Sequence, residues 1–305
     1  MEFVGGVGFT NIDLIYSDMS RLPSIGEEVF AGNFGMHLGG GVPATLITTS
    51  RLGVPSKILT FVGNDFFSGF AKNAFKECGV EIINLYRGSD MPVVLTSTMV
   101  CSHDRTFTSY RNQNIATDSA GEEIYRNLTG AKVVDMHPGF LDIYKRLKAE
   151  GTILLFDTGW EDDLSIEKYR EYLELADYYL PNQKEALKIT EARTVEEAAE
   201  TLSSYFHDVI IKLDKDGCIL KNEKGLQLIR SMQGVKSVDA TGAGDAFMGG
   251  FIYGIYHDYP VETCIRFGNV TGGTCVQGIG CLTKYVTETE LLELVGTISC
   301  SNANS

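Results

Sequence analysis

The chain has 305 residues and a formal net charge of −14, from 26 Lys and Arg residues against 40 Asp and Glu residues. This acidity disfavours nucleic acid and anionic membrane surfaces as partners, because both repel a negatively charged protein. With 44% hydrophobic and 22% charged residues, the chain has the composition of a globular protein with a large core. No apolar run is long enough to span a membrane, and the seven cysteines form no CxxC pair. We therefore expect a cytoplasmic protein with reduced thiols.

Apolar strands and amphipathic helices alternate along the chain from about residue 40 to its end. In chain order, the pattern predicts strands at 2–9, 57–62, 132–136, 152–156 and 209–213. It predicts helices at 45–52, 66–78, 143–149, 166–175, 195–206 and 243–257. Strands that alternate with helices of this size are typical of βαβ units and a mostly parallel sheet. The expected fold class is α/β, with residues 1–305 forming a single domain.

Two segments, 13–37 and 92–110, interrupt this alternation. The first has scattered apolar residues around a Pro-Ser-Ile-Gly turn, and the second alternates apolar and polar residues, as half-exposed strands do. We expect both to form antiparallel strands outside the main sheet, together making a small lid over one of its edges. Two surface hairpins without a function are the alternative.

The predicted lid would expose an apolar face. An isolated two-stranded hairpin is only marginally stable in water. The residues that would form this face are Leu14, Tyr16, Phe30 and Phe34. Because a second copy of the lid is the simplest cover for such a face, we expect a homodimer formed through the lid.

The strongest functional signal lies in residues 237–251. An apolar strand end there runs into Thr-Gly-Ala-Gly at 241–244 and then into a predicted helix. Small residues at a helix start leave backbone N–H groups uncovered, and together with the helix dipole these groups bind anions. Asp245, in the first helical turn, would accept a proton from a hydroxyl placed beside the anion. An ordinary Asp favoured by the helix dipole is the alternative.

Two other phosphate-binding motifs are not supported. The chain contains no G-x-x-x-x-G-K-[ST] sequence, which excludes a Walker-type loop. The glycines of residues 5–8 follow a predicted strand, but the third glycine of a dinucleotide-binding fingerprint is missing. The chain also continues from them into the lid rather than into a helix.

Five motifs, in the right order, resemble those of the ribokinase-like (PfkB) carbohydrate kinases. They are Gly39–Gly41 followed by Arg51–Gly53, Phe61–Asp65 with Gly69, Asn182–Glu185, Val209–Gly217 and Asp239–Phe247. This resemblance covers essentially the whole chain. It implies a three-layer α/β/α fold with a mostly parallel central sheet and a small β lid. It also implies an ATP-dependent, Mg²⁺-using kinase that transfers the γ-phosphate of ATP to a hydroxyl of a small sugar or sugar derivative.

The resemblance implies a role for each matching residue. Asp245 would be the catalytic base, and an anion hole would be formed by the N–H groups of Gly242, Ala243 and Gly244. The acceptor would contact Asn11, Asp13, Gly40 and Gly41. The nucleotide would contact Asn182, Lys212, Asp214, Gly217, Gly244 and Asn269. Glu185 would hold Mg²⁺ through water, and a monovalent cation such as K⁺ could be held by Asp239 and Thr241.

Several of these residues also have a purely structural interpretation, and some positions depart from the family pattern. Asn182 followed three residues later by Glu185 is the pattern of a helix capping box. Asn269 could be an ordinary polar helix residue. An Asn is usual shortly after the first glycines, where this chain has Val42–Thr45, and Asp214 stands where a Gly is usual. Residues 278–280 also differ from the usual late loop, which bears on cation binding.

A further part of the acceptor pocket is predicted from the loop that begins with His137. This loop follows a strand whose carboxyl end would face the crevice where ligands bind in such sheets. His137 could donate a hydrogen bond to the acceptor, and Arg105 or Arg111 from the second lid segment could add positive charge. Capping of the next helix by His137 is the alternative.

Two other functions fit the same sequence. A nucleoside kinase would differ only in its acceptor pocket. A non-catalytic protein that senses sugars or nucleotides could share the fold, although the intact Asp245 argues against it. Fructose, ribose, a keto-deoxy acid, a fructosamine and a hexose phosphate all remain open as acceptors.

Overall fold

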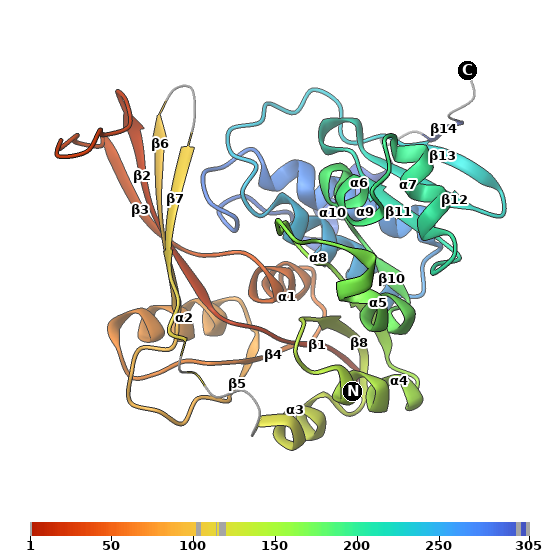
Figure 1. Cartoon of the computed structure of the whole chain (residues 1–305), viewed down its shortest axis with the longest axis horizontal. Coiled ribbons are helices and arrows are strands. Elements are labelled where there is room, and N and C mark those ends of the chain that lie inside the picture. The colour runs from red at the N-terminus through yellow and green to blue at the C-terminus, as the bar shows by residue number, and fades with distance from the viewer. Residues whose placement is uncertain (1, 102–104, 114, 116–119, 297–299, 303–305) are drawn as a thin grey trace.

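The centre of the protein is a six-stranded sheet in which all neighbouring strands are parallel, in the order β10-β9-β8-β1-β4-β5 (Figure 1). The computed structural model describes residues 2–101, 105–113, 115, 120–296 and 300–302. The strands are β1 (Phe3–Val7), β4 (Ser56–Thr60), β5 (Glu81–Asn84), β8 (Ala131–Met136), β9 (Ile153–Phe156) and β10 (Tyr178–Tyr179). The parallel sheet is therefore confirmed, and four of the five strands predicted for it are found there, with ends that differ from the prediction by at most two residues.

Helices cover both faces of this sheet because its strands carry apolar residues on both sides. Val133 packs into one core and the next residue, Val134, into the other. The first core includes residues of α1 (Val42–Arg51), α2 (Phe66–Glu77), α8 (Ala243–Tyr256), α9 (Val261–Cys275) and α10 (Glu288–Val295). The second includes residues of α3 (Gly121–Leu128), α4 (Leu141–Ala149), α5 (Ile166–Leu175), α6 (Gln183–Thr190) and α7 (Val195–Leu202). The predicted three-layer α/β/α architecture is confirmed.

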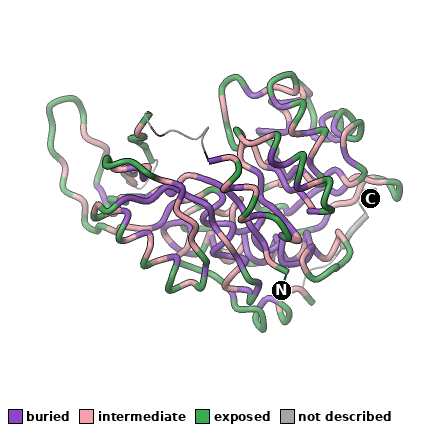
Figure 2. Tube along the Cα trace, turned by 90° about the horizontal axis from the view of Figure 1, so that it is seen from below, coloured by how far each residue is buried: buried purple, intermediate pink, exposed green. Residues whose placement is uncertain are grey.

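The buried residues run through the middle of the molecule, whereas the segments that project from it are largely exposed (Figure 2). Among the described residues, no helix has both the length and the apolar character that a membrane span requires.

A four-stranded sheet, in the order β3-β2-β6-β7, stands beside the core and forms the lid (Figure 1). Its strands are β2 (Asn11–Met19), β3 (Asn33–Leu38), β6 (Val94–Cys101) and β7 (Arg105–Tyr110). Each hairpin is antiparallel, as predicted, but β2 and β6 pair in parallel. The two hairpins therefore form one continuous sheet, which the prediction of antiparallel strands did not include. Residues 102–104 of the predicted lid lie outside the described residues.

A third sheet contains β11 (Val209–Lys212), β12 (Cys218–Asn222), β13 (Gly225–Ile229) and β14 (Cys300–Asn302) in antiparallel order. We expected the strand at 209–213 to belong to the central sheet. Instead, a tight turn reverses the chain after β11, and β11 touches the central sheet region through a parallel bridge between Asn182 and Lys212. This bridge places the start of α6 beside the end of β11.

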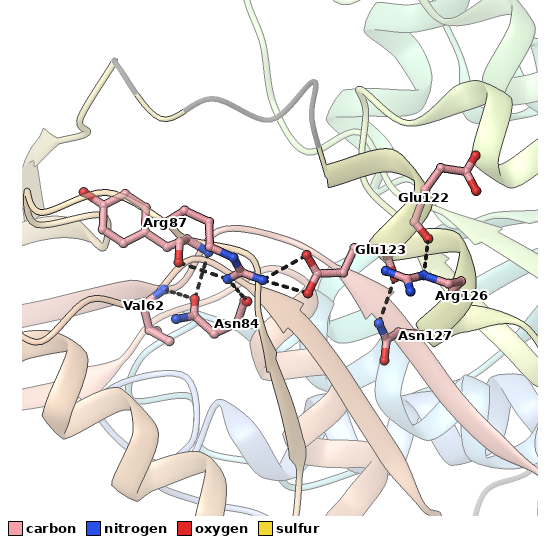
Figure 3. Close-up of polar contacts among 8 residues, drawn as sticks. Val62, Asn84, Arg87, Glu122, Glu123, Arg126 and Asn127 are labelled. Carbon is pink, nitrogen blue, oxygen red and sulfur yellow. Dashed lines mark hydrogen bonds and ion pairs between the residues drawn. The ribbon is translucent and has the colours of Figure 1, made fainter.

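The free edge of the central sheet is tied to α3 by Arg87, just beyond β5. The Arg87 guanidinium donates to both carboxylate oxygens of Glu123, at 2.8 and 3.0 Å, and to the backbone oxygen of Asn84 at 2.6 Å (Figure 3). The Asn84 side chain in turn accepts the backbone N–H groups of Val62 and Tyr86. These bonds fix the loop that follows β5 against the helix layer.

Helices α8 and α9 approach closely through glycines. A Cβ atom on Gly250 would lie 2.3 Å from Oγ1 of Thr271 and 2.6 Å from the backbone oxygen of Phe267. A Cβ atom on Gly254 would lie 2.6 Å from Sγ of Cys264. No side chain fits at these positions, so this packing sets where the N-terminus of α8 lies.

Gly250→Ala should lower the free energy of unfolding by about 1–3 kcal/mol, because overpacking outweighs the higher helix propensity of Ala. Gly69→Ala is the matched control, since Gly69 also lies in a helix but has nothing within 4 Å of an added Cβ. It should raise the same free energy by roughly 0.5–1 kcal/mol. Urea denaturation measures both changes, and equal stabilisation by the two substitutions would contradict the tight packing of α8 on α9.

Candidate active site

The turn before α8 has a backbone that only glycine can provide. Gly242 is the N-cap of the helix and has a φ of 76°, in the left-handed region. A Cβ atom there would lie 2.0 Å from Cβ of Cys281. The helix begins directly after it, at Ala243, so the N–H groups of the first turn lie at the end of α8 where the helix dipole favours negative charge.

Asp245, in this first turn, meets the glycines that precede α1. A Cβ atom on Gly40 would lie 2.5 Å from Oδ2 of Asp245, so a side chain at position 40 would displace the carboxylate. The backbone N–H of Gly41, which is the N-cap of α1, donates a hydrogen bond to Asp245. The structure thus brings together the two glycine motifs that the sequence places at opposite ends of the chain.

The environment of Asp245 shifts its proton affinity strongly. Burial raises the pKa of the Asp245 carboxyl from its ordinary value of 3.8 to about 7. The hydrogen bond from Gly41 and the charge of Lys212 act in the opposite direction, whereas Asp157 and Asp13 raise the pKa further. A carboxyl group with a pKa near neutrality is well suited to accept a proton at physiological pH.

Asp13 lies near the base of the lid, on β2, with a side chain that is almost completely buried. Asn11 donates a hydrogen bond from Nδ2 to Oδ1 of Asp13 at 2.8 Å, and its own Oδ1 accepts the hydroxyl of Thr96 at 3.1 Å. Burial raises the pKa of Asp13 to about 6, Asn11 lowers it and Asp239 raises it. Asn11, a predicted acceptor residue, therefore fixes the side chain of Asp13, the other one. The charge of Asp13 also contributes to the raised pKa of Asp245.

A groove of about 400 Å³ lies between the lid and the loop at 279–283. Its lining residues are Ile15, Ser17, Asn33, Phe34, Gly35, His37, Ile279 and Thr283. His37 is the cross-strand partner of Asp13, and burial lowers the pKa of its imidazole. The volume is of the size that small-molecule ligands occupy.

The start of α6 carries the predicted Asn182 motif, and here the capping-box interpretation is confirmed. The Asn182 side chain accepts the N–H of Glu185 at 3.0 Å, and the Glu185 carboxylate accepts the N–H of Asn182 at 2.8 Å. Lys212 lies beside this cap through the parallel bridge. Its ammonium donates to Oδ2 of Asp157 at 3.0 Å, and a Cβ atom on Gly244 would lie 3.4 Å from its Nζ. Lys212 thus connects the start of α6 to the glycine turn of α8.

Buried charges surround Lys212. Burial lowers the pKa of Lys212, but the carboxylates of Asp157 and Glu185 outweigh it, so the ammonium stays charged. Burial is the main cause that raises the pKa of Glu185, and the negative charge of Asp157 raises it further. Burial is the main reason why the pKa of Asp135 lies well above its usual range, and the negative charges of Asp157 and Asp245 raise it further.

Sequence reasoning missed three of these polar residues: Asp135, Asp157 and His37. Asp135 is next to the last residue of β8, and Asp157 directly follows β9. The signal that could have found them is an acidic residue at the carboxyl end of an apolar parallel strand, where ligands bind in open α/β sheets. His37 had no comparable signal, because its place depends on the register of the lid.

The other predicted nucleotide residues lie around the third sheet. Asp214 has a φ of 49° in the turn after β11, and a Cβ atom on Gly217 would lie 2.1 Å from the backbone oxygen of Ile229. Asn269 is buried, and its amide donates to the backbone oxygens of Ile229 and Arg230 at 3.1 and 3.2 Å. The Asn269 side chain therefore holds the end of β13, and its contact with adenine stays a prediction.

The three residues predicted from the loop and the second lid segment lie in two different places. His137 contacts the ring of Phe9 at 6.3 Å between centroids, and the Arg111 guanidinium lies 3.9 Å above the same ring. Burial lowers the pKa of His137, whose Nδ1 lies 2.8 Å from the backbone oxygen of Pro138. Arg105 instead contacts Asp239 and Thr241 in the loop before α8.

Residues 1–288 match the sequence profile of the pfkB family of carbohydrate kinases. The chain belongs to this family. A ribokinase of Lactococcus lactis is 25% identical over 287 residues, which cover 92% of each chain. A nucleoside kinase of Methanocaldococcus jannaschii is 25% identical over 309 residues, which cover 96% of each chain. The solved structure of Arabidopsis thaliana ribokinase complexed with ribose and ATP has a TM-score of 0.78 at 22% identity, covering 97% of this chain and 99% of that one.

These similarities confirm the predicted family, fold and class of reaction. The protein is a carbohydrate kinase, an ATP-dependent phosphotransferase with an alcohol group as acceptor. Within the described ranges, no group of three His, Cys, Asp or Glu side chains is close enough to hold a metal ion on its own.

Asp245→Asn should stabilise the folded pfkB-family kinase at high pH. Because the folded state raises the pKa of Asp245 from 3.8 to about 7, it binds more protons than the unfolded state in this window, and stability is lost as pH rises through it. Asn carries no charge, so we expect the melting temperature at pH 8 to rise by roughly 2–4 °C. At pH 5, where the carboxyl is mostly protonated, the change should be much smaller.

The matched control is Asp142→Asn, because Asp142 is also in the first turn of a helix but is exposed. Its melting temperature should not change at either pH. An equal shift at pH 5 and pH 8 for Asp245→Asn would contradict the assigned titration.

Proposed function

We propose that Asp245 is the general base of this kinase and that it accepts the proton of a hydroxyl on a small sugar or sugar derivative. The observation that carries this proposal is the contact of the Asp245 carboxylate with Gly40 and Gly41, directly beside the glycine turn of α8. A sugar hydroxyl is a poor nucleophile at neutral pH. A positioned carboxylate typically contributes about 10²–10⁴-fold by removing its proton in the transition state.

The backbone N–H groups of Gly242, Ala243 and Gly244 stabilise the charge that develops on the migrating phosphoryl group. Donors of this kind are worth about 10²–10³-fold each in comparable anion holes. Most of the remaining acceleration comes from holding the two substrates in line and from neutralising phosphate charge. Lys212, beside Gly244, supplies one positive charge at this point.

Magnesium fits the carboxylates of Asp157 and Glu185. Both are hard oxygen ligands of the kind that Mg²⁺ prefers. Burial raises the pKa of Glu185, and the nearby Asp157 carboxylate raises it further. Mg²⁺ bound with ATP neutralises phosphate charge, and Glu185 would contact it through water. Asn182 caps the helix that carries Glu185, while Asp214 and Gly217 shape the turn on the nucleotide side.

On the acceptor side, Asp13 accepts two hydroxyl groups while Asn11 holds it in place. Gly40 and Gly41 let the acceptor approach the backbone closely. His137 and Arg111, which both contact the Phe9 ring, complete the proposed pocket. A nucleoside would use the same base and anion hole, so the acceptor panel below also includes nucleosides.

The test is ADP release measured over a panel of sugars, keto-deoxy acids, fructosamines, hexose phosphates and nucleosides. For the best acceptor, Asp245→Asn should lower kcat by about 10²-fold or more while ATP and acceptor still bind. The pH profile of wild-type kcat/KM should fall below about pH 7, because the base must be ionised. Asp142→Asn serves again as the control, and retention of more than about a tenth of kcat by Asp245→Asn would falsify the assignment.

We also propose a cytoplasmic location. Cys218, Cys264, Cys275 and Cys281 are free, buried thiols, and burial raises the pKa of the Cys218 thiol. Thiols of this kind suit a reducing compartment in which ATP is available.

A homodimer through the lid is proposed from the exposed aromatic residues of the lid. Tyr16 is 37% exposed and Phe34 is 57% exposed, and these cross-strand neighbours have ring centroids 5.2 Å apart. Phe30, in the loop between β2 and β3, is also exposed. A second lid would remove this apolar surface from water.

Sedimentation at micromolar concentration should therefore show a dimer, and Phe34→Glu should shift it to a monomer by placing a charge in the contact. The lid substitution should leave the melting temperature of the core close to that of the wild type. A strictly monomeric wild-type profile would contradict the proposed dimer.

A further inference from the structure

The first residue of β7, Arg105, reaches from the lid to the loop that precedes the glycine turn of α8. Its Nη1 atom lies 2.7 Å from Oδ1 of Asp239 and 3.1 Å from Oγ1 of Thr241. The Asp239 carboxylate also accepts the N–H and the hydroxyl of Thr241, at 2.9 and 2.7 Å, and the N–H of Gly280 at 3.0 Å. One lid side chain therefore joins a network that already holds this loop.

Asp239 is a largely buried carboxylate that is paired with Arg105. Its side chain is only 14% exposed, and it lies three residues before Gly242, where the proposed anion hole begins. Burial raises the pKa of Asp239, but the donors from Gly280 and Thr241 and the charge of Arg105 outweigh it, so the group is a carboxylate at neutral pH. A bare carboxylate there would repel the phosphoryl group, and the guanidinium offsets this repulsion.

A monovalent cation does not fit beside Asp239 and Thr241 while this contact is made. The resemblance to ribokinase-like kinases implied K⁺ bound by these two residues. Oδ1 of Asp239 and Oγ1 of Thr241, the side-chain oxygens that would face such an ion, both lie within hydrogen-bond distance of a single nitrogen of Arg105. The guanidinium thus takes the place of the ion at this donor pair.

A second lid strand meets Gly280, which lies in the loop after α9 and whose N–H binds Asp239. A Cβ atom on Gly280 would lie 3.1 Å from Cγ of His37, which is on β3. Arg105 is on β7, at the opposite edge of the lid sheet. Both outer strands of the lid therefore contact the Asp239–Gly280 pair.

We propose that Arg105 is a positioning residue that supplies, from the lid, the positive charge this loop needs, so that the kinase works without a monovalent cation. The anion-hole loop is then held in its working geometry when the lid lies over the site. This inference rests on the proposed role of the turn at 242–244 as the anion hole. It removes Arg105 from the acceptor pocket, where the sequence had suggested it.

Arg105→Met tests the proposal, because Met keeps an apolar stem and removes the charge. Two measurements are made in KCl and in choline chloride at equal ionic strength: the melting temperature, and the steady-state kinetics. For the wild type, neither the melting temperature nor kcat should respond specifically to K⁺. For Arg105→Met, kcat should fall about tenfold or more while the acceptor KM changes little. K⁺ should then raise its melting temperature, because an ion that binds only the folded state stabilises it.

Two further variants test whether the effect of Arg105→Met comes from the loss of its charge at this position. Arg105→Lys restores a charge on a similar stem and should recover part of the kcat lost in Arg105→Met. Arg21→Met is the matched control, since Arg21 is also a lid arginine paired with an acid, Glu27, but that pair is exposed. Its kinetics and melting temperature should equal those of the wild type in both salts.

Three results would overturn the proposal. They are a potassium-specific rise in the wild-type melting temperature, unchanged kcat in Arg105→Met, and a rise in the acceptor KM of that variant with no change in kcat. The last result would place Arg105 in the acceptor pocket. The melting measurement needs no turnover, so wild-type inactivity on every acceptor would contradict the proposed function, whereas K⁺ stabilisation of the wild type would contradict this inference alone.

Discussion

The contact between the Asp245 carboxylate and the backbone of Gly40 and Gly41 is the constraint on which the rest of the site depends. It requires the N-termini of α1 and α8 to meet at one point, with no side chain between them. Close packing provides this: a Cβ atom on Gly249 of α8 would lie 2.6 Å from Cβ of Thr48 on α1. On its other side, α8 packs on α9 through further glycines. The position of the carboxylate is therefore set by the core, not by the loops that carry its neighbours.

Around this point the protein gathers more negative than positive charge. Burial raises the pKa values of Asp13 and Asp245 to about 6 and about 7, and it raises the pKa of Asp135 well above its usual range. Lys212 is a buried positive charge among them. In the proposed function, such a site would repel free ATP, and Mg²⁺ bound with ATP would cancel part of the phosphate charge. The raised pKa values of these carboxyl groups thus follow from their burial at a site that, in the proposed function, receives charged substrates.

The sequence was sufficient for the features that depend on local chemistry. The parallel sheet followed from strands that are apolar on both faces, and the turn at 242–244 followed from glycines at a predicted helix start, the pattern expected of an anion-binding turn. Pairing between distant strands could not be predicted in this way, so β11 was assigned to the wrong sheet and the parallel pairing of β2 with β6 was not expected. Asp135 and Asp157 belong to no motif, and they become part of the site only because neighbouring parallel strands end at one edge. The partners of Arg105 and Asn269 likewise depend on tertiary packing.

The lid is one continuous sheet, so the contacts made by its different strands are connected to one another. Side-chain hydrogen bonds cross three of its strands, from Asp13 to Asn11 on β2, from Asn11 to Thr96 on β6, and from Thr96 to Ser109 on β7. Arg105 lies on this same β7 strand. Because these strands are hydrogen-bonded into one sheet, a movement of the lid that separates Arg105 from Asp239 would also move Asp13, the proposed acceptor residue. The proposed acceptor residue Asp13 and the contact of Arg105 with the loop before α8 therefore belong to a single sheet.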